Sequence, residues 1–321
     1  MSEALPSLWL VLNEAPGLRP TSTEPIHPVT PPGLIRRPTW RELRDQVLTQ
    51  APLLSAPAPG VPGLCAVCRG PASRGSVCCF QCDLHRQCAP GSLADIVVPV
   101  AFAIKGGPHA SNLWRYKSGH IAAGTTAPTT AETTAQMAAR PLLALLLVFL
   151  RDHGACVWRA AGRPAPTHLA VVPTARGRPG AHPLRSLISP YLTCRWAELS
   201  ARPGDHPVRE LDPGRFSAAP IAGASVLLLD DTWTTGSTAQ SATMALRRSG
   251  ATSIAIVVLG RHVSVPASGA SLPGIRDVGP QALPFRPEFC AVHDDGGDSG
   301  RADRHTHPNS AVDAQFHDHG P

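Results

Sequence analysis

The segment from residue 226 to residue 259 constrains the fold more than any other part of the chain. It begins with the apolar run VLLL (226–229), which is typical of a strand buried on both faces of a parallel sheet. Two acids, a loop of hydroxyls with one glycine, and a helical stretch ending at Gly250 follow. A second apolar run, SIAIVVL (253–259), predicts another buried strand. The segment therefore predicts one strand–helix–strand unit with polar residues at its first turn.

That turn, residues 230–238 (DDTWTTGST), has the composition of an anion-binding loop. A helix N-terminus presents unpaired backbone N–H groups and partial positive charge, which stabilise a bound phosphate. Gly236 lets the backbone approach the anion closely. Hydroxyl groups on both sides of the glycine can add donors: Thr234, Thr235, Ser237 and Thr238.

Two acids, Asp230 and Asp231, stand between the strand and this loop. Their carboxylates would repel a phosphate, so we expect them to bind sugar hydroxyls or a metal ion beside it. A phosphate cradle next to such acids fits a 5-phosphorylated ribose. The loop lacks the glycine spacing and the lysine of a nucleotide P-loop, which argues against hydrolysis of ATP or GTP. Trp233 is expected to pack within the loop, with base stacking as the alternative.

Residues 226–238 resemble the phosphoribosyl pyrophosphate (PRPP) motif of type I phosphoribosyltransferases, an apolar strand followed by two acids and a TTGxT loop. The resemblance implies that residues 234–238 hold the 5-phosphate, that the two acids face the ribose hydroxyls, and that Mg²⁺ bridges pyrophosphate and ribose. It also implies that the loop after the apolar run 168–173 (HLAVVP) faces the pyrophosphate. Arg176 and Arg178 in that loop are either phosphate ligands, for which guanidinium groups are well suited, or solvated side chains.

Six of the nine cysteines lie between residues 65 and 88. Four of them form two Cys-x-x-Cys pairs around a ten-residue loop: Cys65, Cys68, Cys79 and Cys82. This spacing can place four thiolates tetrahedrally around a structural Zn²⁺, which would supply folding energy to a segment with few apolar residues. Cys78 could replace Cys79, and His85 or Cys88 could replace a later ligand. The other three cysteines are expected to be ordinary thiols: Cys156, Cys194 and Cys290.

A zinc knuckle ahead of such a domain resembles the ComF-type proteins, phosphoribosyltransferase-like proteins of bacteria, some of them linked to DNA uptake in competence. Residues 112–119 (NLWRYKSG) look like the LKYKG element of that family, with Arg115 and Lys117 as further candidate contacts. The resemblance covers residues 63–263 and implies an α/β fold: a type I phosphoribosyltransferase-like, mainly parallel five-stranded sheet with helices on both faces, preceded by the knuckle. Residues 177–184 (GRPGAHPL) depart from the RGFNQ-like sequence of the family, so its partner contacts and second substrate do not carry over.

The expected domains are a Pro-rich, mostly disordered segment (1–60), a four-cysteine zinc knuckle (61–90), a phosphoribosyltransferase-like domain (91–265) and a disordered tail (266–321). Within the first segment, Thr39 and Glu42 predict a capping box at the start of one helix. The longest apolar run, residues 141–150, is about half of what a bilayer requires and predicts a buried helix. We therefore expect a cytoplasmic protein without membrane insertion.

Together these patterns predict a phosphoribosyltransferase, a pentosyltransferase that binds PRPP or another ribose 5-phosphate ligand with Mg²⁺ and transfers the phosphoribosyl group to an unknown acceptor. The expected catalytic residues are Asp230, Asp231, Arg176 and Arg178. Two alternatives remain: a module that senses PRPP or a nucleotide, and a non-catalytic accessory protein that meets single-stranded DNA or a DNA-processing helicase. The net charge of +6 is compatible with phosphorylated ligands and with nucleic acid.

Overall fold

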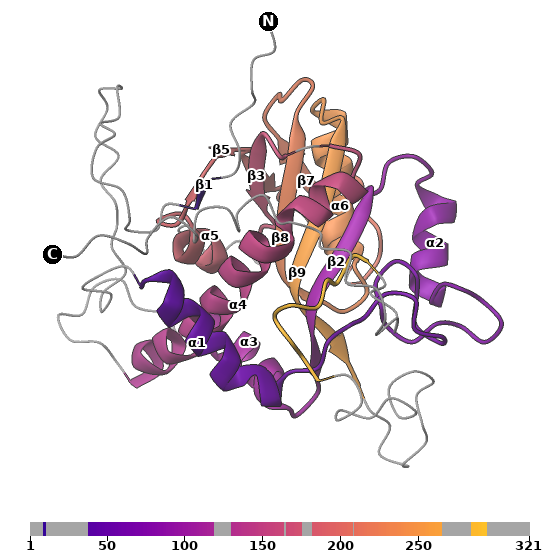
Figure 1. Cartoon of the computed structure of the whole chain (residues 1–321). Helices are drawn as coiled ribbons and strands as arrows, with labels where there is room; N and C mark the ends of the chain where they lie inside the picture. The colour runs from indigo at the N-terminus through magenta and orange to yellow at the C-terminus, as the bar shows by residue number, and fades with distance from the viewer. Residues whose placement is uncertain are drawn as a thin grey trace, which may run out of the picture.

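The computed structural model describes residues 9–10, 38–118, 130–163, 165–174, 182–207, 209–264 and 284–293. Within these residues a five-stranded parallel sheet forms the centre of the molecule, with the strand order β2-β9-β8-β3-β5 (Figure 1). Its strands are β2 (Ile96–Ile104), β3 (His168–Val171), β5 (Arg195–Trp196), β8 (Ser225–Trp233) and β9 (Ser253–Val263). Every neighbouring pair runs parallel. The predicted α/β fold with a mainly parallel sheet is confirmed.

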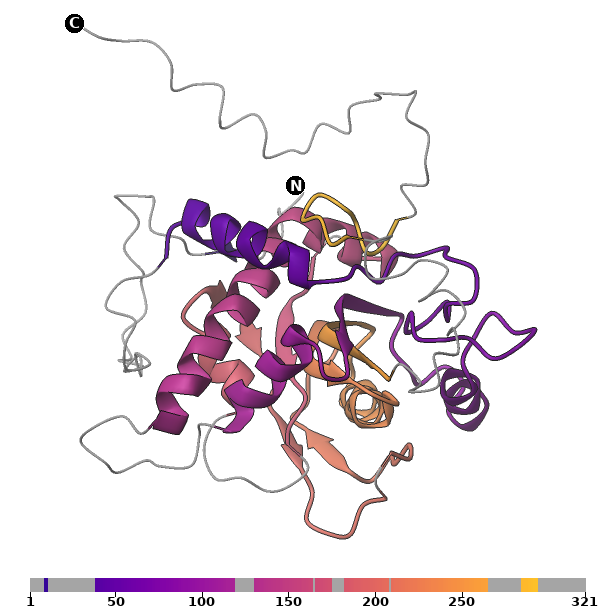
Figure 2. The ribbon, with the colours of Figure 1, turned by 90° about the horizontal axis from the view of Figure 1, so that it is seen from below.

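Apolar residues on both faces of the strands explain why the sheet is buried between helices. In β8, Leu227 and Leu229 belong to the core on one side of the sheet, whereas Val226 and Leu228 belong to the core on the other. The helices of the first side are α1 (Trp40–Gln50), α3 (Pro108–Ser118), α4 (Thr130–Ala160) and α5 (Pro183–Ile188). α6 (Ser237–Arg248) covers the second side, as Figure 2 shows.

α4 is the central helix of the larger core. Its residues from Leu142 to Leu150 are at most 5% exposed, so the helix is buried around its whole circumference there. By length and composition α4 could cross a membrane, but 72% of its most apolar window is buried inside the structure. Residues 141–150 therefore form the buried helix that the sequence predicts.

Two small antiparallel sheets flank the central one. β6 (Leu199–Ala201) pairs with β7 (Phe216–Ala218), and β1 (Trp9–Leu10) pairs with β4 (Leu192–Thr193). Phe216 is 1% exposed and anchors β7 in the α6-side core. The connection between β6 and β7 returns to α6, where the Asp212 N–H donates to Ser241 Oγ at 2.9 Å.

α1 begins with the predicted capping box. The Glu42 N–H donates to Thr39 Oγ1 at 3.3 Å, and the Thr39 N–H donates to Glu42 Oε2 at 2.7 Å. Leu43 and Val47, one turn apart, are buried against α4, and the short helix η1 (Ala51–Leu53) follows. Residues 38–60 are thus part of the folded domain, and they include the helix that the sequence predicts near Thr39.

Residues 284–293 differ from the expectation of a disordered tail after residue 266. Ser55 and Pro284 form an antiparallel bridge. Phe285, Ala291 and Val292 pack against the α4-side core. These apolar residues explain why this short stretch is held to the domain despite the polar sequence around it.

Candidate functional site

The C-terminal ends of β3 and β8 lie side by side at the point from which the chain continues toward opposite edges of the sheet. Val171 pairs with Leu229, and the Val172 N–H donates to the Leu229 carbonyl at 3.0 Å. After β3 the chain continues to β5 at one edge, whereas after β8 it continues to β9 in the opposite direction. Open α/β sheets bind ligands in the crevice at such a reversal. The loops after β3 and β8 are therefore the candidate ligand-binding loops.

Gly236 shapes the loop after β8. Its φ of +83° is left-handed, and a Cβ at this position would lie 2.0 Å from Trp233 Cζ2. Trp233 is 1% exposed, so it packs beneath the loop and offers no face for base stacking. Gly236, the N-cap of α6, has no side chain to cap the helix. Thr235 Oγ1 accepts a hydrogen bond of 3.4 Å from the Ser237 N–H, but no side chain among the described residues accepts from the next N–H groups, those of Thr238 and Ala239. These N–H groups can bind an outside acceptor, as expected of an anion site.

The hydroxyls of the loop already have partners within the chain. Ser237 Oγ donates to the Arg209 carbonyl at 2.6 Å and lies 2.8 Å from Thr235 Oγ1. Thr238 Oγ1 accepts a hydrogen bond of 3.2 Å from Arg215 Nη1. Thr234 is exposed. Three of the four hydroxyls in the predicted cradle, residues 234–238, are thus held by other groups of the chain, and the fourth belongs to the exposed Thr234.

Arg215 is a candidate functional residue that the sequence reasoning missed. It is only 3% exposed, its guanidinium also donates to the Pro207 carbonyl, and its Nε lacks a hydrogen-bond partner among the described residues. It lies at the start of β7, far from the loop in sequence, so no local pattern identifies it. Its positive charge beside Thr238 favours an anion at the loop.

The two acids near the end of β8 have different surroundings. Asp231 is 5% exposed and is bound by α3: Tyr116 Oη donates to its Oδ2, and Lys117 Nζ lies 2.5 Å from its Oδ1. Burial, followed by the Asp231 carboxylate, raises the pKa of Tyr116 well above its usual value, which keeps the phenol a donor. Lys117, proposed on sequence as a ligand contact, is in this structure a partner of Asp231.

Asp230 faces the other way. Successive strand residues point to opposite faces, so Asp230 lies on the α6 side, where the loop is. Its Oδ1 accepts a hydrogen bond of 2.8 Å from the Asp231 N–H. Burial, and then the neighbouring Asp231 carboxylate, raise the pKa of Asp230 to about 7. Asp230 is therefore the acid that is placed to meet a ligand.

Arg176 and Arg178 lie in residues 175–181, outside the described residues. Of the described residues at the start of this loop, Val172 is hydrogen-bonded to the Leu229 carbonyl of β8.

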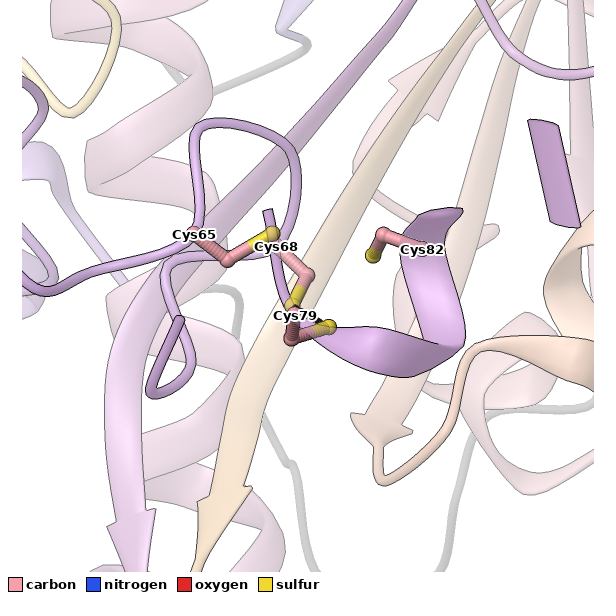
Figure 3. Close-up of side chains that lie close together, drawn as sticks. All are labelled: Cys65, Cys68, Cys79 and Cys82. Carbon is pink, nitrogen blue, oxygen red and sulfur yellow. Dashed lines mark hydrogen bonds between the residues drawn. The ribbon is translucent and has the colours of Figure 1, made fainter. Parts of the chain in front are cut away.

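The four predicted cysteine ligands converge (Figure 3). Cys65 and Cys68 lie on a tight turn, Cys79 is the N-cap of α2 (Phe80–Cys88), and Cys82 is in its first turn. Their sulfurs all lie within 4.8 Å of one another. Cys68 Sγ and Cys79 Sγ are 3.8 Å apart, and a tetrahedral ion with Zn–S bonds of about 2.3 Å holds two sulfurs about 3.8 Å apart. This four-cysteine cluster could therefore hold a metal ion such as zinc.

The structure also shows how the three alternative ligands, Cys78, His85 and Cys88, lie relative to the cluster. Cys78 is outside the cluster, and its Sγ accepts a hydrogen bond of 3.2 Å from Arg86 Nη1. His85 Nε2 lies 3.0 Å from Gln81 Nε2, and Cys88 is exposed. Cys79 is therefore the third member of the cluster, as expected in the sequence.

Arg261 of β9 connects the four-cysteine cluster with the loop after β8. Its Nη1 donates to the carbonyls of Trp233 at 3.2 Å and Thr234 at 3.1 Å. The turn of Cys65 and Cys68 lies against the same guanidinium, because a Cβ on Gly70 would lie 2.0 Å from Arg261 Nη2. The knuckle thus supports a residue that orients the candidate ligand loop.

No protein-family model matches the chain, and no curated protein matches it significantly. The residues of the site themselves determine which chemistry it can perform. These provide a helix N-terminus with a glycine turn, one carboxylate on the same side of the sheet, and a buried guanidinium.

Proposed function

We propose that this protein binds PRPP with Mg²⁺ and transfers its phosphoribosyl group to an acceptor. The observation that carries the proposal is the position of residues 234–238 at the start of α6, four residues after Asp230 and at the reversal of strand order. An anion site next to a carboxylate fits a ligand with a phosphate and vicinal hydroxyls on one ribose.

Each described residue of the site has a role in this proposal. The backbone of the α6 N-terminus and Thr234 bind the 5-phosphate, and Arg215 adds positive charge behind them. Asp230 accepts hydrogen bonds from the ribose hydroxyls and offsets positive charge at the anomeric carbon. Asp231, bound to Tyr116 and Lys117, is a positioning residue that fixes the end of β8 against α3.

The reaction breaks the bond between the anomeric carbon and pyrophosphate and forms a bond from that carbon to the acceptor. Mg²⁺ would neutralise charge on the pyrophosphate. Positioning and electrostatics account for most of the catalysis in such a displacement. Arg176 and Arg178 are proposed to bind the leaving pyrophosphate, because guanidinium groups pair with two phosphate oxygens at once.

We also propose that the ion of the four-cysteine cluster is Zn²⁺ with a structural role. Four protein ligands would close the coordination sphere, which is typical of structural rather than catalytic zinc.

Calorimetric titration of the full chain with PRPP and Mg²⁺ tests the proposal. We expect binding by the wild-type protein, loss of binding in Asp230→Asn, and unchanged binding in Asp45→Asn, which alters an exposed acid on α1. A screen of nucleobases and ammonia for pyrophosphate release then identifies the acceptor. Absence of wild-type binding would refute the assignment of the ligand.

One observation favours the second candidate, a DNA-binding accessory protein. Trp114 is 70% exposed on α3, next to the exposed Arg115, and exposed aromatics beside cations stack on single-stranded bases. Fluorescence polarisation with a labelled single strand tests this candidate. It predicts binding that falls steeply with salt and is lost in Trp114→Ala.

A further inference from the structure

A second group of metal-binding side chains lies on the α4 side of the sheet, away from the four-cysteine cluster. His153 and Cys156 are one turn apart on α4 and so share a face of the helix. Cys290 comes from the stretch 284–293 that packs against this helix (yellow in Figure 2). One ligand atom of each of these three residues lies within 4.8 Å of the other two. Cys156 and Cys290 are therefore not the unrelated thiols that the sequence suggests.

The imidazole of His153 is oriented as a metal ligand. Its Nε2 lies 2.6 Å from the Pro287 carbonyl, which can only accept a hydrogen bond, so Nε2 carries the proton. In the neutral ring, Nδ1 then carries the lone pair that can bind a metal ion. Metal-binding histidines nearly always donate their other ring N–H to a carbonyl or carboxylate in this way.

His293 lies beside this group, although it is not one of the three residues whose ligand atoms all lie within 4.8 Å of one another. Its Nδ1 lies 3.6 Å from Cys290 Sγ. With Zn–S of about 2.3 Å and Zn–N of about 2.0–2.1 Å, a tetrahedral site places sulfur and nitrogen about 3.6 Å apart. The two sequence pairs, His153-x-x-Cys156 and Cys290-x-x-His293, are also the short spacings that metal knuckles use.

We propose that His153, Cys156, Cys290 and His293 bind one Zn²⁺, which fastens residues 284–293 to α4. Two thiolates and two imidazoles are a closed, structural set of zinc ligands. Residues 284–293 need this additional attachment to α4, because their packing against the core leaves space unfilled. A cavity of about 150 Å³ lies between residues 56–59, α4 and residues 285–293. Metal binding can supply the folding energy that this small apolar contact does not provide.

Metal analysis of the full chain, purified in a non-chelating reductant and titrated with Zn²⁺, tests the proposal. We expect two zinc ions per chain, one in each cluster. The double variant Cys156→Ser/Cys290→Ser should bind one. The matched control Cys194→Ser should bind two, because Cys194 is half-buried and donates to the Thr167 carbonyl outside both clusters.

A second measurement avoids variants that fail to fold. His293 is exposed, so His293→Ala should leave the fold intact while it weakens binding of the second ion about tenfold or more. Cobalt substitution reports the ligands directly, because a site with two thiolates absorbs differently from one with four. One zinc ion per saturated wild-type chain, or a disulfide between Cys156 and Cys290 in the reduced preparation, would overturn the proposal.

Discussion

Asp230→Asn is expected to stabilise the free protein while it abolishes ligand binding. The pKa of Asp230 is raised from 3.8 to about 7 because the carboxyl group is buried beside Asp231. The folded state therefore holds a proton that the unfolded state releases, and stability falls as pH rises between these two values. Asparagine resembles the protonated acid, and its Oδ1 can still accept the Asp231 N–H.

The magnitude follows from the shift in pKa. A shift of about three units corresponds to about 4 kcal/mol, since one unit is about 1.4 kcal/mol. Asp230 as a whole residue is half-buried, so solvent screening reduces this value and we expect a gain of about 2 kcal/mol. The gain should be near zero at pH 4, grow through pH 5 and 6, and reach its full value above pH 7.

Urea unfolding followed by tryptophan fluorescence measures this gain at a series of pH values. Asp231→Asn is the matched control, because the same chemical change there removes the charge paired with Lys117 and replaces one of the two oxygens that accept from Tyr116 and Lys117 by an NH2 donor. We expect that variant to be destabilised by about 1–3 kcal/mol. The reasoning is refuted if Asp230→Asn gives the same change in the free energy of unfolding at pH 4.5 and pH 8.

Three further changes test the loop and its support. Gly236→Ala forces a left-handed alanine against Trp233, so the free energy of unfolding should fall by about 2–5 kcal/mol, measured with urea, and PRPP binding should be lost. Arg261→Met removes the donors to the Trp233 and Thr234 carbonyls, so calorimetry should show PRPP binding weakened about tenfold while the zinc content stays unchanged. Unaltered binding would show that the knuckle does not support the ligand site through Arg261. Cys82→Ser should reduce zinc content by one ion and lower the melting temperature, and a melting curve like that of the wild type would contradict a structural role for that ion.

Local patterns predict the parts of the site that are contiguous in the chain. The strand–loop–helix of residues 226–248 is predictable because the apolar run, Gly236 and the helical stretch each favour one local conformation. The four-cysteine cluster is predictable for the same reason. The choice of Cys79 over Cys78 depends on the three-dimensional structure. Cys79 is the N-cap of α2, whereas the Cys78 thiol accepts a hydrogen bond from Arg86.

Contacts between distant residues were not predictable. Arg215 reaches Thr238 only because the β6–β7 connection returns to α6. His153 and Cys290 meet across more than a hundred residues, although their short spacings to Cys156 and His293 were visible. The separation of Asp230 from Asp231 follows from strand alternation, which extends further along β8 than the apolar run indicates.

The contact of Gly70 with Arg261 has an evolutionary consequence. A side chain at position 70 would require the Arg261 guanidinium to shift away from the Trp233 and Thr234 carbonyls, so changes at the two positions should be coupled. Homologous chains with a larger residue at the position of Gly70 should carry a shorter residue at the position of Arg261. In those chains the carbonyls at the end of β8, those equivalent to Trp233 and Thr234, must find another donor.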